Sequence, residues 1–233
     1  MTITFVAAGS AVQTSTTTLA LVAPTLLVDD ILIAQIISIN NGAITAPDAT
    51  WTEIQQANFT GSRAALFWKR VITGDSGATF NFTVAGTTTS YGILTHYRGV
   101  RYHGPAIGTS TLSANASADN VTYATLTPHS NGGVVVACGF YAEDATTAGT
   151  VSGTNPTFNA PSVDVEQATL ENASLFQSYG YSLGGATGAV TQSTTSTIDA
   201  VSAGVLFDLL PPIAGGGGSG VIYPPRERNG DRN

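Results

Sequence analysis

The chain has 233 residues, of which 42% are hydrophobic and only 10% are charged. An average soluble protein has about 25% charged residues, and disordered chains combine high charge with few apolar residues, so this composition excludes disorder as the main state. The longest apolar run, residues 31–39, is much shorter than the roughly 20 residues that cross a bilayer. We therefore expect no membrane insertion.

The charge balance argues against a nucleic-acid partner. The formal net charge is −7, whereas phosphate binding needs clustered Lys and Arg. The basic residues are instead spread over residues 63–101, with three more among the last eight positions. The single cysteine, Cys138, cannot form an internal disulfide, and its apolar neighbours predict a small buried side chain.

Short runs rich in Val, Ile, Thr, Phe and Tyr recur along the chain, separated by Gly, Asn, Asp or Pro, and predict β-strands. The expected strands are residues 3–8, 16–22, 31–39, 50–56, 64–71, 79–84, 91–97, 122–126, 133–141, 163–170, 174–182, 194–200 and 203–210. Only residues 162–171 allow a helix as an alternative. This pattern predicts an all-β fold, a β-sandwich of jelly-roll-like type.

Similar segments in the two halves of the chain predict an internal repeat. The matching pairs are residues 27–34 with 131–137, 63–69 with 173–179, and 91–97 with 202–208. Two copies do not make a solenoid, which needs more and shorter repeats. We therefore expect one β-sandwich domain, residues 1–212, with pseudo-repeated halves of about residues 1–100 and 118–212 and a seam within residues 99–117.

The composition changes after Pro212. Residues 213–220 are glycine-rich and predict a flexible linker. Residues 221–233 combine a diproline with mixed charges, which predicts an extended arm that orders only on a partner. The residues expected to dock are Val221, Ile222, Tyr223, Pro224, Pro225, Arg226, Arg228 and Arg232.

The residues that carry chemistry form no recognisable catalytic or metal-binding pattern. No nucleophile elbow occurs, and His96, His103 and His129 stand in unrelated contexts. Adjacent acids such as Asp29 and Asp30, or the pair at residues 143–144, point to opposite faces of a strand and make no catalytic dyad. We expect no enzyme, no metal and no cofactor, although a calcium site on these acids stays open as an alternative.

The two tryptophans are expected in the core. Trp68 lies within an expected strand and Trp51 begins another, and aromatic residues in such positions most often fill the space between sheets.

The first hundred residues resemble a β-sandwich domain of tailed-bacteriophage virion proteins. The matching motifs are a "gD-lLva" strand at residues 30–34, "P-x-g-W-t" at 47–52, "lyyK-vatg" at 66–74 and "yRGv" at 97–100. Thr50 stands where the family has glycine before the tryptophan. These motifs are structural, so the resemblance implies a fold and a virion setting.

The resemblance implies a non-enzymatic structural protein of the virion, in the tail-fibre or baseplate region, with other virion proteins as partners. The N-terminus lacks the features of a secretory signal, so we expect assembly in the host cytoplasm. We also expect a homo-oligomer, with a trimer favoured. Because a strand already begins at Ile3, the C-terminal arm is the expected anchor.

Two alternative functions stay open. A head decoration (cement) protein also joins a β domain to an extended arm. A carbohydrate-binding module would recognise a glycan on the host surface, and its expected contacts are Tyr102, Tyr123 and Tyr141, which lie near the ends of expected strands.

Overall fold

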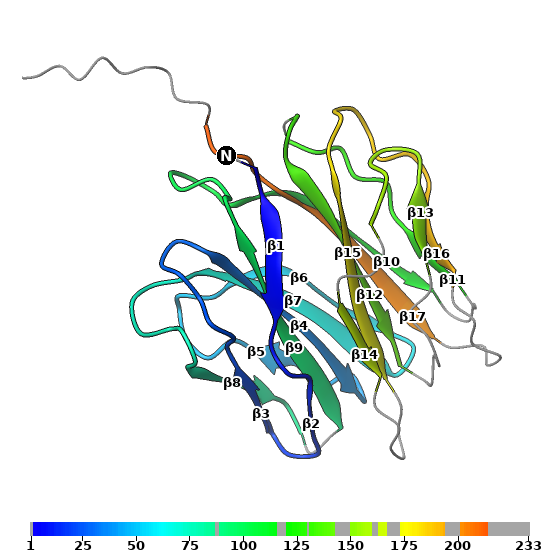
Figure 1. The fold of residues 1–233 in the computed structure, drawn as a ribbon. Helices are drawn as coiled ribbons and strands as arrows, with labels where there is room; N and C mark the ends of the chain where they lie inside the picture. The colour runs from blue at the N-terminus through cyan, green and yellow to red at the C-terminus, as the bar shows by residue number, and fades with distance from the viewer. Residues whose placement is uncertain are drawn as a thin grey trace, which may run out of the picture.

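The computed structural model describes residues 2–86, 89–115, 120–129, 131–142, 150–159, 163–166, 173–193 and 201–213. These residues form seventeen β-strands, all paired antiparallel, and no helix (Figure 1). The predicted all-β sandwich is confirmed. The expected linker and arm lie outside the described residues, apart from Ile213.

The first half of the chain builds two sheets. The first inner sheet has the order β1-β9-β4-β7-β6, with β2 also paired to β9, and the first outer sheet has the order β3-β8-β5. Their bounds are β1 Thr4–Ala8, β2 Val12–Thr14, β3 Thr18–Val22, β4 Ile31–Ile39, β5 Ile44–Thr45, β6 Thr52–Phe59, β7 Ser62–Arg70, β8 Thr79–Val84 and β9 Ser90–Arg98.

The second half repeats this arrangement. The second inner sheet has the order β10-β17-β12-β15-β14, and the second outer sheet has the order β11-β16-β13. Their bounds are β10 Ile107–Asn115, β11 Asn120–Tyr123, β12 Val134–Tyr141, β13 Val151–Gly153, β14 Val163–Glu166, β15 Ser174–Tyr181, β16 Val190–Ser193 and β17 Ser202–Leu209. The two halves therefore share one topology, as the repeat predicted.

The four sheets stack in layers, with the two inner sheets facing each other. Alternate residues of β4 point to opposite sides: Ile31 and Ile33 enter the central core, while Leu32 and Ala34 pack under the first outer sheet. The strands β12 and β17 alternate in the same way between the central core and the second outer sheet. Because both faces are covered, these strands are continuous apolar runs.

Equivalent hydrogen bonds fix the alignment of the two halves. The Val71 N–H donates to Asp30 O (2.9 Å), and the Ser182 N–H donates to Gly133 O (2.8 Å) in the same place of the second half. Position 30 thus corresponds to 133, and position 71 corresponds to 182. Residues 63–69 match 174–180, so the predicted pairing with 173–179 was wrong by one residue.

The alignment of β9 with β17, the equivalent strands of the two halves, needs the same correction. Gly92 lies opposite Ile36, and Gly204 lies opposite Gly139, so residues 91–97 match 203–209 instead of 202–208. At both glycines, a strand of an outer sheet packs closely against the backbone of the inner sheet. A Cβ at Gly92 would lie 2.7 Å from the Leu19 side chain, and one at Gly204 would lie 2.6 Å from the Val121 side chain.

Several strand predictions need correction. β10 lies inside the expected seam and supplies the edge of the second inner sheet, so that sheet begins well before residue 118. β16 ends at Ser193, and the strand expected at residues 194–200 lies outside the described residues. The described part of residues 162–171, at 163–166, is strand and not helix.

Cys138 is fully buried, as expected.

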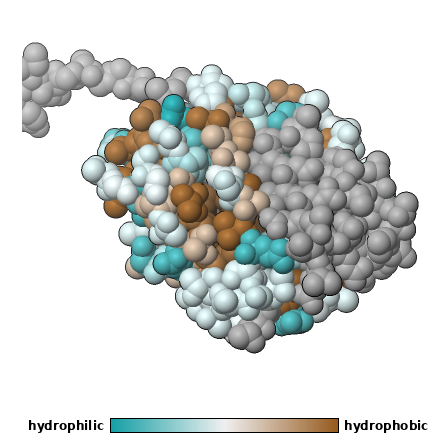
Figure 2. All heavy atoms as spheres, turned by 60° about the horizontal axis from the view of Figure 1, so that its bottom comes forward, coloured by the Kyte–Doolittle hydropathy of each residue, from teal (hydrophilic) through white to brown (hydrophobic). Residues whose placement is uncertain are grey.

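The surface matches the low charge of the composition. Figure 2 shows a face on which most described residues are pale, between hydrophilic and hydrophobic, with few strongly hydrophilic areas. β1 begins at one end of the sandwich, and residues 210–213, which follow β17, lie at the same end (Figure 1). That end carries the most exposed apolar loops.

Candidate functional site

The loops at this end form an exposed apolar surface, which we call the end surface: Leu27, Val28, Tyr102 and Ile213. Their exposed fractions are 55%, 56%, 57% and 64%. Tyr102 separates two hollows. One, of about 260 Å³, lies between Leu27, Val28 and Tyr102, and the other, of about 130 Å³, lies between Tyr102, Pro212 and Ile213. Exposed apolar patches of this kind mark interaction sites.

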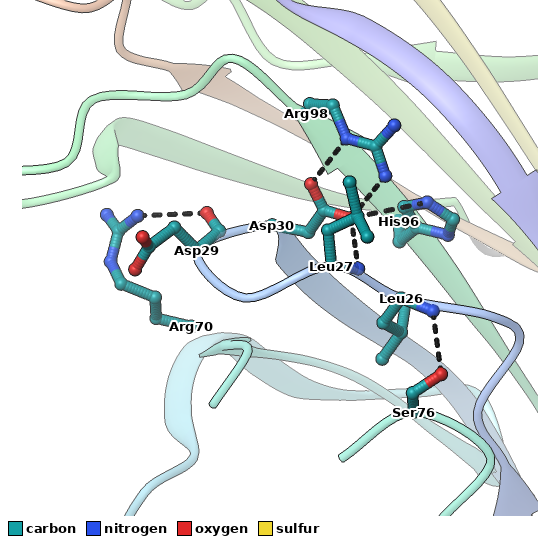
Figure 3. A network of polar contacts seen from close by, with 8 residues as sticks. All are labelled: Leu26, Leu27, Asp29, Asp30, Arg70, Ser76, His96 and Arg98. Carbon is teal, nitrogen blue, oxygen red and sulfur yellow. Dashed lines mark hydrogen bonds and ion pairs between the residues drawn. The ribbon is translucent and has the colours of Figure 1, made fainter. Parts of the chain in front are cut away.

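A buried carboxylate holds the loop beneath the end surface (Figure 3). Arg98 Nε and Nη2 donate to Asp30 Oδ1 and Oδ2, both at 2.9 Å, and the Leu27 N–H donates to Asp30 Oδ2 at 3.0 Å. Asp30 N–H donates in turn to Leu27 O at 3.2 Å. Asp30 therefore closes the turn that carries Leu27 and Val28.

His96 lies on the other side of the same carboxylate. Its Nε2 is 3.6 Å from Asp30 Oδ2, and the ring is fully buried in β9. Burial lowers the pKa of His96 below its usual 6.5; Asp30 opposes this shift and Arg98 adds to it. Burial by itself would raise the pKa of Asp30, but the hydrogen bonds from Arg98 and Leu27 outweigh it, so that pKa lies below its usual value.

We expect the free energy of unfolding to fall as the pH drops below about 6.5. The unfolded chain takes up a proton on His96 near the usual pKa of 6.5, whereas the folded chain does so only at lower pH. The loss of stability therefore begins near the pKa of His96 in the unfolded chain and is complete below the pKa of His96 in the folded chain. Denaturant unfolding from about pH 8 to about pH 5 measures it.

The His96→Gln variant should lose stability less steeply over this range, because it removes the titrating group. His103→Gln is the matched control, since His103 is exposed and should leave the pH dependence unchanged. Equal slopes for the two variants would contradict the assignment to His96.

Arg70 fixes the position of Tyr102. Its guanidinium lies 5.7 Å from the centre of the Tyr102 ring, within the range of a cation–π contact. Arg70 also donates to the carbonyl oxygens of Asp29 (3.2 Å) and Arg101. The same side chain thus ties the loop before β4 to the loop after β9, so the end surface is built from segments far apart in the sequence.

Only one of the three predicted glycan contacts is exposed. Tyr102 is on the end surface, but Tyr123 and Tyr141 are 4% and 0% exposed in the core between the second inner and outer sheets. The Tyr123 hydroxyl donates to Gln192 Oε1 at 3.0 Å, and burial raises its pKa well above the usual value. Tyr123 and Tyr141 were therefore wrongly predicted, because their side chains face inward.

A third hollow, which the sequence analysis did not predict, lies where β6 and β10 meet, and we call it the edge hollow. It measures about 280 Å³, and its lining residues are Thr52, Glu53, Ile54 and Trp68 from the first inner sheet and Pro105, Ile107, Gly108 and Ser110 from the segment around the start of β10. Trp68 is only partly buried, so its predicted place in the core is wrong in part. Trp51 is buried, as expected.

The described residues offer no metal cluster and no reactive thiol. No cluster of three or more His, Cys, Asp or Glu that could hold a metal occurs within the described ranges, and the acids at positions 143–144 lie outside them. Burial raises the pKa of the Cys138 thiol to about 12, so this thiol is not reactive at neutral pH.

Comparisons with family models, curated proteins and solved structures found no match. In the part of the chain that the structure covers, no helix is long and apolar enough to cross a membrane. The predicted docking residues of the arm, Val221 to Arg232, lie outside the described residues.

Proposed function

We propose that the protein is a non-enzymatic structural component of a tailed-phage virion, in the tail-fibre or baseplate region. It joins the particle as a homo-oligomer through its C-terminal arm and the end surface. The phage setting rests on the motifs at residues 30–34 and 97–100, which resemble those of virion β-sandwich domains.

The observation that carries the proposal is the position of the end surface. The linker that leads to the arm begins at Ile213, and Ile213 lines one of the two hollows that flank Tyr102. The turn held by Asp30 presents Leu27 and Val28 beside the same tyrosine. A partner that binds the arm can therefore also cover an apolar surface next to the point where the linker to the arm begins, and burial of such surface favours association.

A chain that ends at Pro212 should fold normally and fail to enter particles. The last strand, β17, ends at Leu209, so this truncation retains all the described strands and should keep the free energy of unfolding of the full chain. Incorporation is measured by producing the truncated and full-length chains during infection and counting each in purified particles. Normal incorporation of the truncated chain would overturn the proposal.

Substitutions in the full chain separate the end surface from the arm. Leu27→Ser with Val28→Ser should reduce incorporation, whereas Val22→Ser, at a 49% exposed position of β3, is the matched control and should not. Immunogold labelling of full-length protein then locates it. Label at the tail end supports the proposal, and label over the head identifies a decoration protein instead.

A further inference from the structure

The chain leaves the sandwich on the end surface itself. Ile213, the last described residue, is 64% exposed and lines the hollow of about 130 Å³ beside Tyr102, which we call the Ile213 hollow. The hollow of about 260 Å³ on the other side of Tyr102 is lined by Leu27 and Val28, and we call it the Leu27 hollow. Residues 214–233 therefore start beside one hollow, with the Tyr102 side chain between them and the other.

The segment beyond Ile213 contains a single run of large apolar side chains, Val221, Ile222 and Tyr223, which we call the apolar triplet. The seven residues 214–220 connect Ile213 to this triplet. A flexible linker of that length has an r.m.s. end-to-end distance of about 15 Å and spans more than about 20 Å when extended. The triplet can therefore reach both hollows of its own molecule.

Charges of both signs lie on the end surface and on the segment that follows the triplet. Asp29 and Arg98 line the Leu27 hollow, and Arg101 lines the Ile213 hollow. Residues 226–232 likewise contain three arginines and two acids. Since neither side carries charges of one sign alone, the contact between apolar side chains is the main attraction.

The length of the linker favours the surface of the same chain over that of a second copy. A short flexible tether holds its end at an effective concentration of about 1 mM near the point of attachment. A second copy present at about 1 μM is about a thousandfold more dilute, so it competes poorly with the tethered triplet.

We propose that the apolar triplet covers the end surface of its own chain until a virion partner displaces it. Contact with Leu27, Val28 and Tyr102 removes apolar surface from water on both sides. Because exposed apolar patches promote association, the covered state keeps copies apart before assembly, and a partner that takes the arm uncovers the end surface in the same step. The purpose of this contact rests on the proposed function, but the two can fail separately, since covering is measured on the purified chain and incorporation on particles.

Disulfide trapping in the full chain tests this contact. Val28→Cys places a thiol at the Leu27 hollow, and Ser219→Cys places a second thiol two residues before the triplet, which stays intact. Cys138 does not interfere, because it is fully buried and burial raises the pKa of its thiol to about 12. With glutathione disulfide as the oxidant, mass spectrometry follows the bond that forms within one chain.

The matched control has the same two cysteines and the same linker, but serine replaces each residue of the triplet. We expect this control to form the bond at least about tenfold more slowly, because only random encounters within the tether remain. Equal rates would show that the tether alone brings the thiols together and would overturn the proposal. A bond between two chains, formed faster at higher protein concentration, would show that the arm covers a second copy and would also overturn it.

Discussion

Replacing Trp51 with alanine should lower the free energy of unfolding by about 3–5 kcal/mol, the usual cost of removing a buried Trp or Phe. Trp51 is 6% exposed, and its ring meets the rings of Phe80 and Phe82 edge-on at 5.2 and 5.1 Å. No hydrogen bond to its indole nitrogen occurs among the described residues. The loss of stability therefore measures the packing of the side chain alone. Denaturant unfolding of the variant measures it.

Trp68→Ala is the matched comparison. Trp68 borders the edge hollow and is only partly buried, so its removal leaves a space that water already reaches, and we expect a cost of about 1–2 kcal/mol. The sequence predicts the same role for both tryptophans. An equal loss in the two variants would show that Trp68 is a core residue, as the sequence predicts.

The strands that are buried on both faces were the easiest to predict. β4 and β12 are runs of apolar residues bounded by turn signals, and the prediction for each agrees with the structure to within one residue. β10 was missed because its sequence, IGTSTLSAN, has a single large aliphatic side chain inside the strand and lies at an edge. It is held largely by backbone pairing with β17, which depends little on side-chain type.

The same burial explains why the repeat was found but misaligned. On a strand with one wet face, apolar and polar residues alternate, and a slip of one residue is visible at once. In β7, Ala64 and Leu66 face the central core while Ala65 and Phe67 face the outer sheet. Apolar residues on both faces make even and odd positions alike, so only the hydrogen-bond register separates them.

The candidate sites depend on tertiary contacts that no local sequence pattern predicts. The edge hollow combines residues 52–54 with residue 68, which the pairing of β6 with β7 brings together, and residues 105–110, which reach them because the two halves pack face to face. The tyrosines show the same limit: Tyr102 and Tyr123 both lie near strand ends, yet one is exposed and the other faces a core. Whether a side chain at a strand end faces a second sheet is decided by tertiary packing.

The Asp75→Asn variant should lose about 3–5 kcal/mol of stability, as expected when one partner of a buried ion pair is removed. Lys69 Nζ lies 2.9 Å from Asp75 Oδ1, and the two side chains are 4% and 9% exposed. The ammonium also donates to Thr50 Oγ1 at 3.1 Å and lies 5.1 Å from the centre of the Phe80 ring. Without the carboxylate of Asp75, the buried ammonium of Lys69 keeps these weaker partners and a minor electrostatic interaction with Asp48.

A second substitution separates the ion pair from other effects of the change. Asparagine can still accept the hydrogen bond that the Ile72 N–H donates to Asp75 Oδ2 at 2.8 Å, so the turn is preserved. Adding Lys69→Met removes the unpaired charge while keeping a long apolar side chain against Phe80, and the double variant should regain most of the lost stability. If the double variant is no more stable than Asp75→Asn alone, the loss comes from the turn and not from the buried charge.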